Sequence, residues 1–394
     1  MKHESLSTLP HSLRVVSLFS GIGGFEVGLH RAGHKTVFMC ESDPYAQQVL
    51  RNRFPETELH SDVTRLSSLP ACDLVTAGWP CQDISLAGTT SGLAGTRSGL
   101  IEEVFRLVGN MPKKPAYILL ENVAFAVELR KGEAIRYVTE RLEQLGYDWA
   151  YRILDTRLFG LPQRRRRLYV LASRVGDPSQ LIFDGAAASM AGPNAEARKV
   201  GFYWTEGNRG TGWSPDALPP LKGGSTVGIP SPPAVWDRDN GSFFQPGIED
   251  AERLQGFIPG WTEAATSIPR GERKRWMLVG NAVSVPVAEW IGRRLAVDGI
   301  SSPGDLQNLR RSEKEFARAG KKTAGASRQF FEPTSEGPAD CHVVTLDDFG
   351  FKQPKALSAR ALAGFTSRFE AAPLKKHPDF LRDLRQALQG VAPH

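Results

Sequence analysis

Short apolar runs alternate with stretches of helical spacing through the first half of the chain. Apolar residues three and four positions apart predict helices at 25–32, 44–54, 100–108 and 133–145. The runs between them are short and bounded by polar or turn-forming residues, as is typical of buried strands, and they lie at 14–19, 37–40, 59–63, 73–77, 116–120, 149–154 and 168–172. We therefore expect an α/β fold with an open sheet, in which ligands bind beyond the carboxyl ends of the strands.

The pattern changes at about residue 174. From there to residue 245 Gly, Pro, Ser and Trp become frequent, with basic residues between them, and this predicts a small loop-rich domain at 174–245. Helical spacing returns at 249–256 and 285–295. The first domain is therefore expected to be discontinuous and to comprise residues 1–173 and 246–300.

The last part of the chain carries no recognisable motif. Residues 301–338 are basic and contain many Gly and Ser residues, which predicts a linker that is flexible in part. Helical spacing follows at 357–369 and 380–388. We expect 301–394 to form a basic linker and a C-terminal extension of unknown role.

Composition narrows the class of protein. The 394 residues are 41% hydrophobic and 23% charged, as in an ordinary globular protein, and no stretch approaches the ~20 apolar residues of a membrane span. The first five residues lack the apolar core of a signal peptide, so we expect a cytoplasmic protein. Its four cysteines lack disulfide and zinc-ligand spacing, and we expect free thiols and no metal. The net charge of +6 is compatible with a polyanionic partner.

A glycine-rich turn follows the first predicted strand, at Ser20-Gly21-Ile22-Gly23-Gly24, and opens a helix. The dinucleotide fingerprint would have Gly where this chain has Glu26, which is an awkward neighbour for a pyrophosphate. Glu41 ends the second strand, where a carboxylate can accept hydrogen bonds from both ribose hydroxyls. These residues favour a cofactor with an adenosine but no pyrophosphate. Asp62 either accepts a hydrogen bond from an adenine amino group or caps a helix or turn.

Two candidate catalytic groups follow predicted strands. Cys81 comes soon after the run at 73–77, and a thiol in such a loop can be partly ionised and act as a nucleophile; the alternative is a structural cysteine. The glycine-rich segment 88–99 is expected to be a mobile lid over the thiol. Glu121 follows the run at 116–120 and is expected on the same rim as an acid, or as a capping or ion-paired residue.

Four consecutive arginines lie at 164–167, after Gln163. A run of like charges normally forms a solvated edge. If the alternation of a strand applies, however, Arg165 and Arg167 point one way, and Arg164 and Arg166 point the other. One pair could then face the site and the other pair a phosphate backbone.

Together these segments resemble the DNA (cytosine-5) methyltransferase family of prokaryotic restriction-modification systems, over roughly residues 13 to 298. The motifs occur in the family's order: Leu18-Phe19-Ser20-Gly21-Ile22-Gly23-Gly24-Phe25, Gly78-Trp79-Pro80-Cys81-Gln82-Asp83, Arg97-Ser98-Gly99-Leu100, Glu121-Asn122-Val123, Gln163 to Arg167, Glu252-Arg253-Leu254-Gln255-Gly256-Phe257 and Gly280-Asn281-Ala282-Val283. One departure is Arg166, where the family often has Glu. Another is Ser284-Val285-Pro286, where a Pro-rich run is more usual.

The resemblance implies a Rossmann-like S-adenosylmethionine-dependent methyltransferase domain with a mixed, mostly parallel sheet, and a target-recognition domain at 174–245. It implies Cys81 as the nucleophile at carbon 6 of cytosine, Glu121 at ring N3 and the exocyclic amine, Arg165 on the O2 side, and Arg167 in support of the loop. It also implies a set of residues lining the cofactor: Phe19, Gly21, Gly23, Glu41, Asp62, Pro80, Leu100 and Asn281.

The resemblance further implies double-stranded DNA as the partner, with the cytosine flipped out of the helix and Ser85 and the lid closing on it. We expect a monomer that associates with the bacterial nucleoid when bound to DNA, and a companion restriction endonuclease that acts separately. An RNA cytosine methyltransferase and an inactive regulatory relative are the alternatives. A zinc deaminase is disfavoured because Gln82-Asp83-Ile84 follows Cys81 in place of x-x-Cys. A thiol hydrolase would need a histidine beside the thiol.

Overall fold

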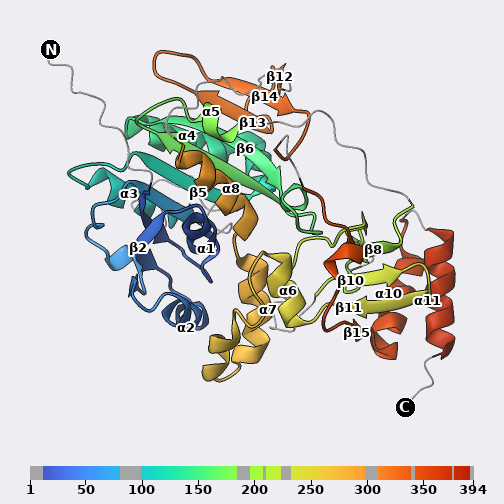
Figure 1. Ribbon diagram of the computed structural model, residues 1–394. Coiled ribbons are helices and arrows are strands. Elements are labelled where there is room, and N and C mark those ends of the chain that lie inside the picture. Colours follow the sequence, from blue (N-terminus) through green and yellow to red (C-terminus); the bar gives the residue numbers. More distant parts are fainter. Residues whose placement is uncertain are drawn as a thin grey trace, which may run out of the picture. The chain divides into compact units, whose positions relative to one another are not determined.

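This computed structural model describes residues 12–79, 99–183, 196–206, 210–222, 232–297, 309–338, 342–374 and 377–390. The chain forms two compact units (Figure 1). The first unit comprises Met1–Asp155, Arg166–Met190 and Val283–Cys341, and the second comprises Thr156–Arg165, Ala191–Ala282 and His342–His394.

The first unit is built around a ten-stranded sheet. Its strands are β1 (Arg14–Leu18), β2 (Lys35–Cys40), β3 (Glu58–His60), β4 (Leu74–Gly78), β5 (Tyr117–Val123), β6 (Asp148–Asp155), β7 (Arg166–Ser173), β12 (Leu309–Ser312), β13 (Ala319–Lys322) and β14 (Gln329–Pro333). They are ordered β12-β14-β13-β6-β7-β5-β4-β1-β2-β3, with β1 to β5 parallel and β7 antiparallel to both of its neighbours. The predicted α/β class with a mixed sheet is confirmed.

Helices cover both faces of this sheet. They are α1 (Gly24–Arg31), α2 (Pro44–Arg53), α3 (Ile101–Gly109), α4 (Glu133–Gln144), α5 (Ser179–Ile182) and α8 (Val285–Leu295). The alternate strand residues Val16, Val75 and Ile118 pack in one core with the apolar side chains of α3 and α4. Glu26 of α1 faces Ser17, so α1 lies on the opposite face. There Gly28 lies so close to α8 that an added Cβ would be 2.6 Å from that of Ala288.

The segment predicted as a basic linker differs from that prediction in its described part. Residues 309–333 form β12, β13 and β14, and β13 pairs antiparallel with β6, from Ala319 opposite Arg152 to Lys322 opposite Trp149. Figure 1 shows these strands continuing the sheet beyond β6. The strands are short and rich in charged residues, so they lack the apolar alternation by which a strand is recognised in a sequence.

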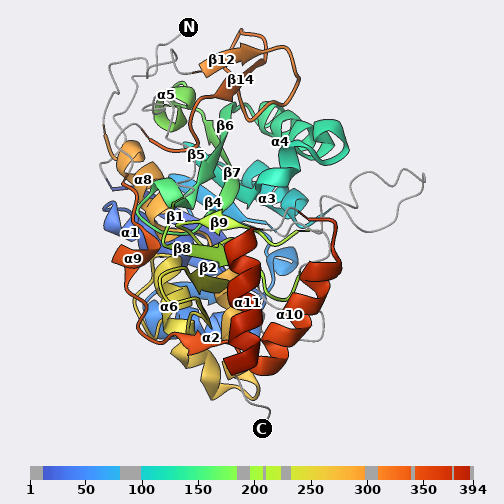
Figure 2. The same ribbon diagram turned by 90° about the vertical axis from the view of Figure 1, so that its right-hand side faces the viewer.

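The second unit contains a five-stranded sheet, ordered β15-β11-β10-β8-β9. Its strands are β8 (Lys199–Phe202), β9 (Ser214–Pro215), β10 (Ala234–Asp237), β11 (Ser242–Gln245) and β15 (Lys355–Ala356), and its helices are α6 (Ile248–Leu254), α7 (Gly271–Asn281), α9 (Leu346–Phe349), α10 (Ala359–Ala371) and α11 (Pro378–Gly390). Helices α10 and α11 lie side by side (Figure 2). They bury an aromatic core in which Phe380 is fully inaccessible and packs against Phe202 and Trp236.

The domain boundaries therefore differ from the predicted ones. Residues 246–282, expected in the first domain, belong to the second unit, and the C-terminal extension is divided between the two units at Cys341. For the C-terminal extension the physical reason is long-range pairing, because β13 joins β6 and β15 joins β11, far away in the sequence. Short-range apolar spacing carries no information about such partners.

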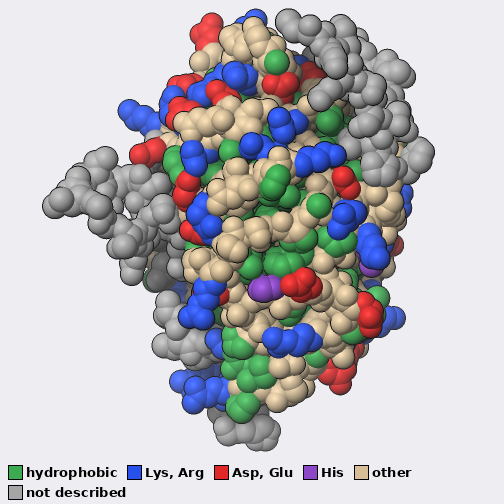
Figure 3. All heavy atoms as spheres, turned by 90° about the vertical axis from the view of Figure 1, so that its left-hand side faces the viewer, with side chains coloured by type: hydrophobic (Ala, Val, Ile, Leu, Met, Phe, Trp, Pro, Cys, Tyr) green, Lys and Arg blue, Asp and Glu red, His purple; other side chains and the backbone are tan. Residues whose placement is uncertain are grey.

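Two further features are the distribution of charged side chains on the surface and the length of the helices. On the face drawn in Figure 3, Lys and Arg side chains lie scattered, with Asp and Glu side chains between them. Among the residues that the structure describes, no helix has the length and apolar character that crossing a bilayer requires.

Candidate active site

The carboxyl ends of three neighbouring strands meet at one rim of the first unit. In the sheet, Leu18 at the end of β1 lies opposite Ala77 of β4, and Gly78 of β4 lies opposite Glu121 of β5. A Cβ added at Gly78 would be 3.6 Å from the Glu121 carboxylate and 4.0 Å from the carbonyl oxygen of Phe19. Phe19, which precedes the glycine turn, the end of β4 before the Cys81 loop, and Glu121 are thus in one place.

The turn after β1 has the backbone that its glycines predict. Gly21 and Gly23 have φ of 57° and 93°, in the left-handed region that favours glycine, and Phe19 is also left-handed at 56°. An added Cβ at Gly21 would meet no atom of the described residues within 4 Å, whereas at Gly24 it would lie 2.3 Å from the carbonyl oxygen of Val283. Among the described residues Gly21 therefore has open space beside it, and Gly24 allows close packing.

Glu41 braces this turn. One carboxylate oxygen accepts a hydrogen bond from the Gly21 amide at 2.7 Å, and the other accepts one from the Asp43 amide at 2.7 Å. Burial raises the pKa of Glu41, and these amide donors oppose that shift. Each carboxylate oxygen keeps a further lone pair, so the residue can still accept hydrogen bonds from a ligand.

The other described residues that were predicted to line the cofactor are Asp62, Leu100 and Asn281, and each has its own surroundings. Asp62 caps a short 3₁₀ helix at Val63–Arg65 by accepting hydrogen bonds from the amide and hydroxyl of Thr64, which lower its pKa. Leu100 is partly buried at the start of α3 and packs on the first unit's core. Asn281 is exposed at the end of α7 in the second unit.

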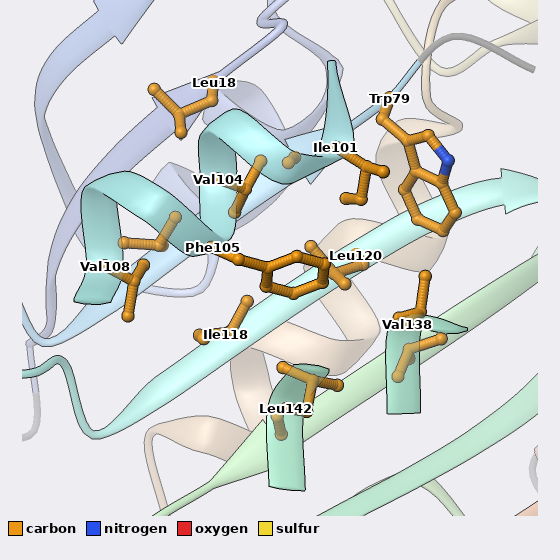
Figure 4. Packing of buried hydrophobic residues seen from close by; sticks show 14 of the residues in the cluster. Leu18, Trp79, Ile101, Val104, Phe105, Val108, Ile118, Leu120, Val138 and Leu142 are labelled. Carbon is orange, nitrogen blue, oxygen red and sulfur yellow. The ribbon is translucent and has the colours of Figure 1, made fainter. Parts of the chain in front are cut away.

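The loop that follows β4 is anchored at its first residue. Trp79 is buried, and its ring lies toward Ile101 and the core of α3 and β5 (Figure 4). Its carbonyl oxygen accepts a hydrogen bond of 3.0 Å from the Asn122 side chain. The predicted residues Pro80, Cys81 and Ser85, together with the predicted lid from 88 to 98, lie outside the described residues.

Glu121 is paired with Arg167. The Glu121 carboxylate and Arg167 Nε are 3.2 Å apart, and both side chains are largely buried. The register explains the contact, because Arg167 lies opposite Val123, and Val123 and Glu121 are two residues apart on one face of β5. The structure therefore brings Arg167, one of the two arginines predicted at the site, to Glu121.

Arg165 is placed differently from the prediction. Its guanidinium is buried and donates hydrogen bonds to the carbonyl oxygens of Gly280 at 2.9 Å and Ala282 at 2.7 Å. The predicted alternation fails because β7 begins at Arg166, and the Arg165 amide closes a tight turn onto the carbonyl of Gln163. Arg165 therefore holds the Gly280–Ala282 backbone, within the second unit.

The two described cysteines are poor nucleophiles. Burial raises the pKa of Cys40 to about 12, and burial likewise raises that of Cys72 to about 12. Neither thiol is therefore ionised at neutral pH. Glu26, which stands where the dinucleotide fingerprint has Gly, is buried beneath the turn, and burial raises its pKa to about 6.

Two positioning residues were not singled out from the sequence. Asn122 joins β5 to the Cys81 loop, and Val283 packs on Gly24 at the start of α1. Both belong to recognised motifs, but the sequence alone does not show which partners they contact. Among the described residues, no group of three or more His, Cys, Asp or Glu side chains is placed to hold a metal ion.

Comparison with known proteins decides the family. The family model for C-5 cytosine-specific DNA methylases matches residues 13–198. The Type II methyltransferase M2.BsuMI of Bacillus subtilis (strain 168) is 44% identical over 369 residues, which cover 90% of this chain and 93% of that protein. The chain belongs to the C-5 cytosine-specific DNA methylases. It is accordingly a DNA (cytosine-5) methyltransferase, and the family implies S-adenosylmethionine as the methyl donor.

Other relatives match this methylase over a smaller part. The Type II methyltransferase M.NgoBI of Neisseria gonorrhoeae is 38% identical over 160 residues, or 40% of this chain and 50% of that protein. The crystal structure of the S. pombe Dnmt2 methyltransferase covers 74% of the methylase and 100% of its own chain, with a TM-score of 0.50 and 17% identity. At this identity the likeness supports the fold alone.

Proposed function

We propose that the methylase transfers a methyl group to carbon 5 of one cytosine in a defined sequence of double-stranded DNA, with Cys81 as the nucleophile. The convergence of the glycine turn, the start of the Cys81 loop and the Glu121–Arg167 pair at one rim carries this proposal. Cys81 follows Trp79 by two residues, and two residues of extended chain span at most about 7 Å. This connection supports a nucleophile near Glu121.

The chemistry assigns a task to each group. Carbon 5 of cytosine is a poor nucleophile, and addition of the Cys81 thiolate at carbon 6 makes it reactive. The methyl group moves to carbon 5, the carbon-5 proton is lost, and expulsion of the thiolate restores the aromatic ring. Glu121 would hydrogen-bond N3 and the exocyclic amine, where it stabilises the charge that develops on addition. Arg167, which contacts Glu121, would hold that carboxyl and face O2, and Arg165 would act as a positioning residue through Gly280 and Ala282.

S-adenosylmethionine would supply an electrophilic methyl group at this rim. The turn residues fit such a ligand, because Gly21 leaves open space and Glu41 can accept hydrogen bonds from the ribose hydroxyls. Phe19, Gly23, Asp62, Pro80, Leu100 and Asn281 would complete the binding site. We propose that no metal ion takes part.

The base must leave the helix, since carbon 6 is unreachable inside a duplex. We infer sequence specificity and a companion endonuclease from the relatives, which are named Type II methyltransferases. We assign base recognition to the second unit, in the part that follows residue 190.

Bisulfite sequencing of DNA from cells that express the protein tests the proposal. Wild type should protect cytosines in one recurring sequence, and Cys81→Ala should lower methyl transfer at least about 1,000-fold while DNA and cofactor binding persist. Cys72→Ala is the matched control and should keep the activity, because that thiol is not ionised at neutral pH. Transfer to RNA but not to DNA, or an active Cys81→Ala variant, would overturn the assignment.

A further inference from the structure

Arg166 is the residue at which the arginine run departs from the pattern of the methylase family. Its guanidinium is paired with Glu336: Arg166 Nε donates to one carboxylate oxygen at 2.7 Å, and Arg166 Nη2 donates to the other. Such a two-point contact fixes direction as well as distance. Glu336 follows β14, in the segment that the sequence predicted as a linker. The family often has a Glu in place of Arg166. In this chain the carboxylate beside position 166 comes instead from Glu336, in the C-terminal part of the chain.

The backbone around Glu336 is itself held in place. The Glu336 carbonyl oxygen accepts a hydrogen bond of 2.9 Å from the amide of Asp155, at the end of β6. The guanidinium of the fully buried Arg152 donates to the carbonyl oxygens of Ser335 at 3.0 Å and Gly337 at 2.7 Å. The Glu336 side chain, which is 15% exposed, is thus presented to Arg166 from a fixed support.

The contact continues toward Glu121 through the next residue. Arg167 Nη1 donates a hydrogen bond of 2.8 Å to the carbonyl oxygen of Arg166, and Arg167 Nε lies 3.2 Å from the Glu121 carboxylate. Arg166 and Arg167 are the first two residues of β7, where the chain enters the sheet from a turn. The position of Arg167 therefore depends on how the Arg166 backbone is held.

We propose that Glu336 is a positioning residue for methyl transfer. It anchors Arg166, and so the backbone that orients Arg167 against Glu121. The inference rests on the proposed role of Glu121 and Arg167 at the base. It gives the chain's C-terminal segment a function in the catalytic step, because a carboxylate supplied there orients the arginine that contacts Glu121.

Glu336→Gln tests this, since the amide keeps the size of the side chain and loses its charge. We expect the single-turnover rate of methyl transfer to fall about tenfold, because a small misplacement of a catalytic group lowers the rate. The dissociation constants for DNA and S-adenosylhomocysteine should stay within about twofold of wild type. Glu315→Gln is the matched control, because Glu315 makes a two-point contact with Arg136 at 2.8 Å on the same segment and should leave the rate unchanged.

A double-mutant cycle keeps the test independent of folding. Arg166→Gln removes the same contact by changing the other partner, whose side chain is 41% exposed. This variant should slow methyl transfer as Glu336→Gln does. Because the two residues act as one unit, the double variant should lose about tenfold and not about a hundredfold. The stoichiometry of S-adenosylhomocysteine binding counts the folded protein in each sample.

The outcomes separate the two proposals. Normal rates in both single variants, multiplicative losses in the double variant, or an equal loss in Glu315→Gln would overturn the role of Glu336 while leaving the methylase reaction intact. If wild type itself transfers no methyl group to cytosine in DNA, the proposed function fails first.

Discussion

The glycine-turn region, residues 14–78, and the C-terminal region, residues 309–390, build their sheets in opposite ways. In the first, β1, β2, β3 and β4 follow each other closely along the chain and pair with one another. In the second, β13 joins β6 and β15 joins β11, and Tyr151 donates a hydrogen bond to the carbonyl oxygen of Ala317, 166 positions away. The first region carries recognisable motifs, and the second carries none.

The difference shows that a segment can be required for the structure without carrying a recognisable sequence motif. The glycine turn must hold a particular backbone next to a ligand, so its residue types are restricted and visible. Most of the C-terminal region presents matching edges and apolar faces, which many sequences can do. Lack of a motif in residues 309–390 therefore says little about their importance, and the predictions below test this.

Phe380→Ala should have the largest effect on stability. The ring is fully buried and packs with centroid distances of 5.1 Å to both Trp213 and Trp236, so its loss leaves a cavity at the centre of the second unit's core. We expect a cost of about 3–5 kcal/mol in the free energy of unfolding. Urea denaturation followed by tryptophan fluorescence measures it.

Arg385→Ala on the same helix is the control for Phe380→Ala. The Arg385 side chain is 60% exposed and pairs with Glu370 at 2.7 Å, and exposed pairs of this kind contribute about 1 kcal/mol or less. If Phe380→Ala unfolds at nearly the same urea concentration as Arg385→Ala, the C-terminal helices are an appendage and the comparison between the two regions fails.

The sequence predicted local structure well and long-range structure poorly. The strand at 116–120 and the helix at 133–145 correspond to β5 (Tyr117–Val123) and α4 (Glu133–Gln144), because burial on a sheet or helix face imposes a short period. At the candidate site, the glycine turn and the place of Glu121 at the rim were predictable from strand ends. Three features were not: β12 to β14, the contact of Arg165 with Gly280, and that of Arg166 with Glu336. Each depends on partners far away in the chain.

Glu41→Ala tests the glycine-turn region next. The carboxylate fixes the Gly21 and Asp43 amides at 2.7 Å each, and hydrogen bonds to a charged group contribute about 1.5–3 kcal/mol. We expect the dissociation constant for S-adenosylhomocysteine, measured by titration calorimetry, to rise about tenfold to a hundredfold. DNA affinity should change less than about twofold. An unchanged constant would remove Glu41 from the cofactor site.

Glu26→Gln should have the smallest effect on stability, and the size of this effect should depend on pH. Burial raises the Glu26 pKa from 4.5 to about 6, against smaller opposing effects of the Ser17 and Ser20 hydroxyls, so the folded state favours the protonated form. Wild type should then lose up to about 2 kcal/mol of stability as pH rises from about 4.5 through about 6. The neutral amide removes this loss, so the variant should exceed wild type above pH 6 and match it near pH 4.5 in urea denaturation. Glu56→Gln, at an exposed position, should follow wild type. A difference that stays constant with pH would show that the Glu26 carboxyl does not titrate beneath the turn.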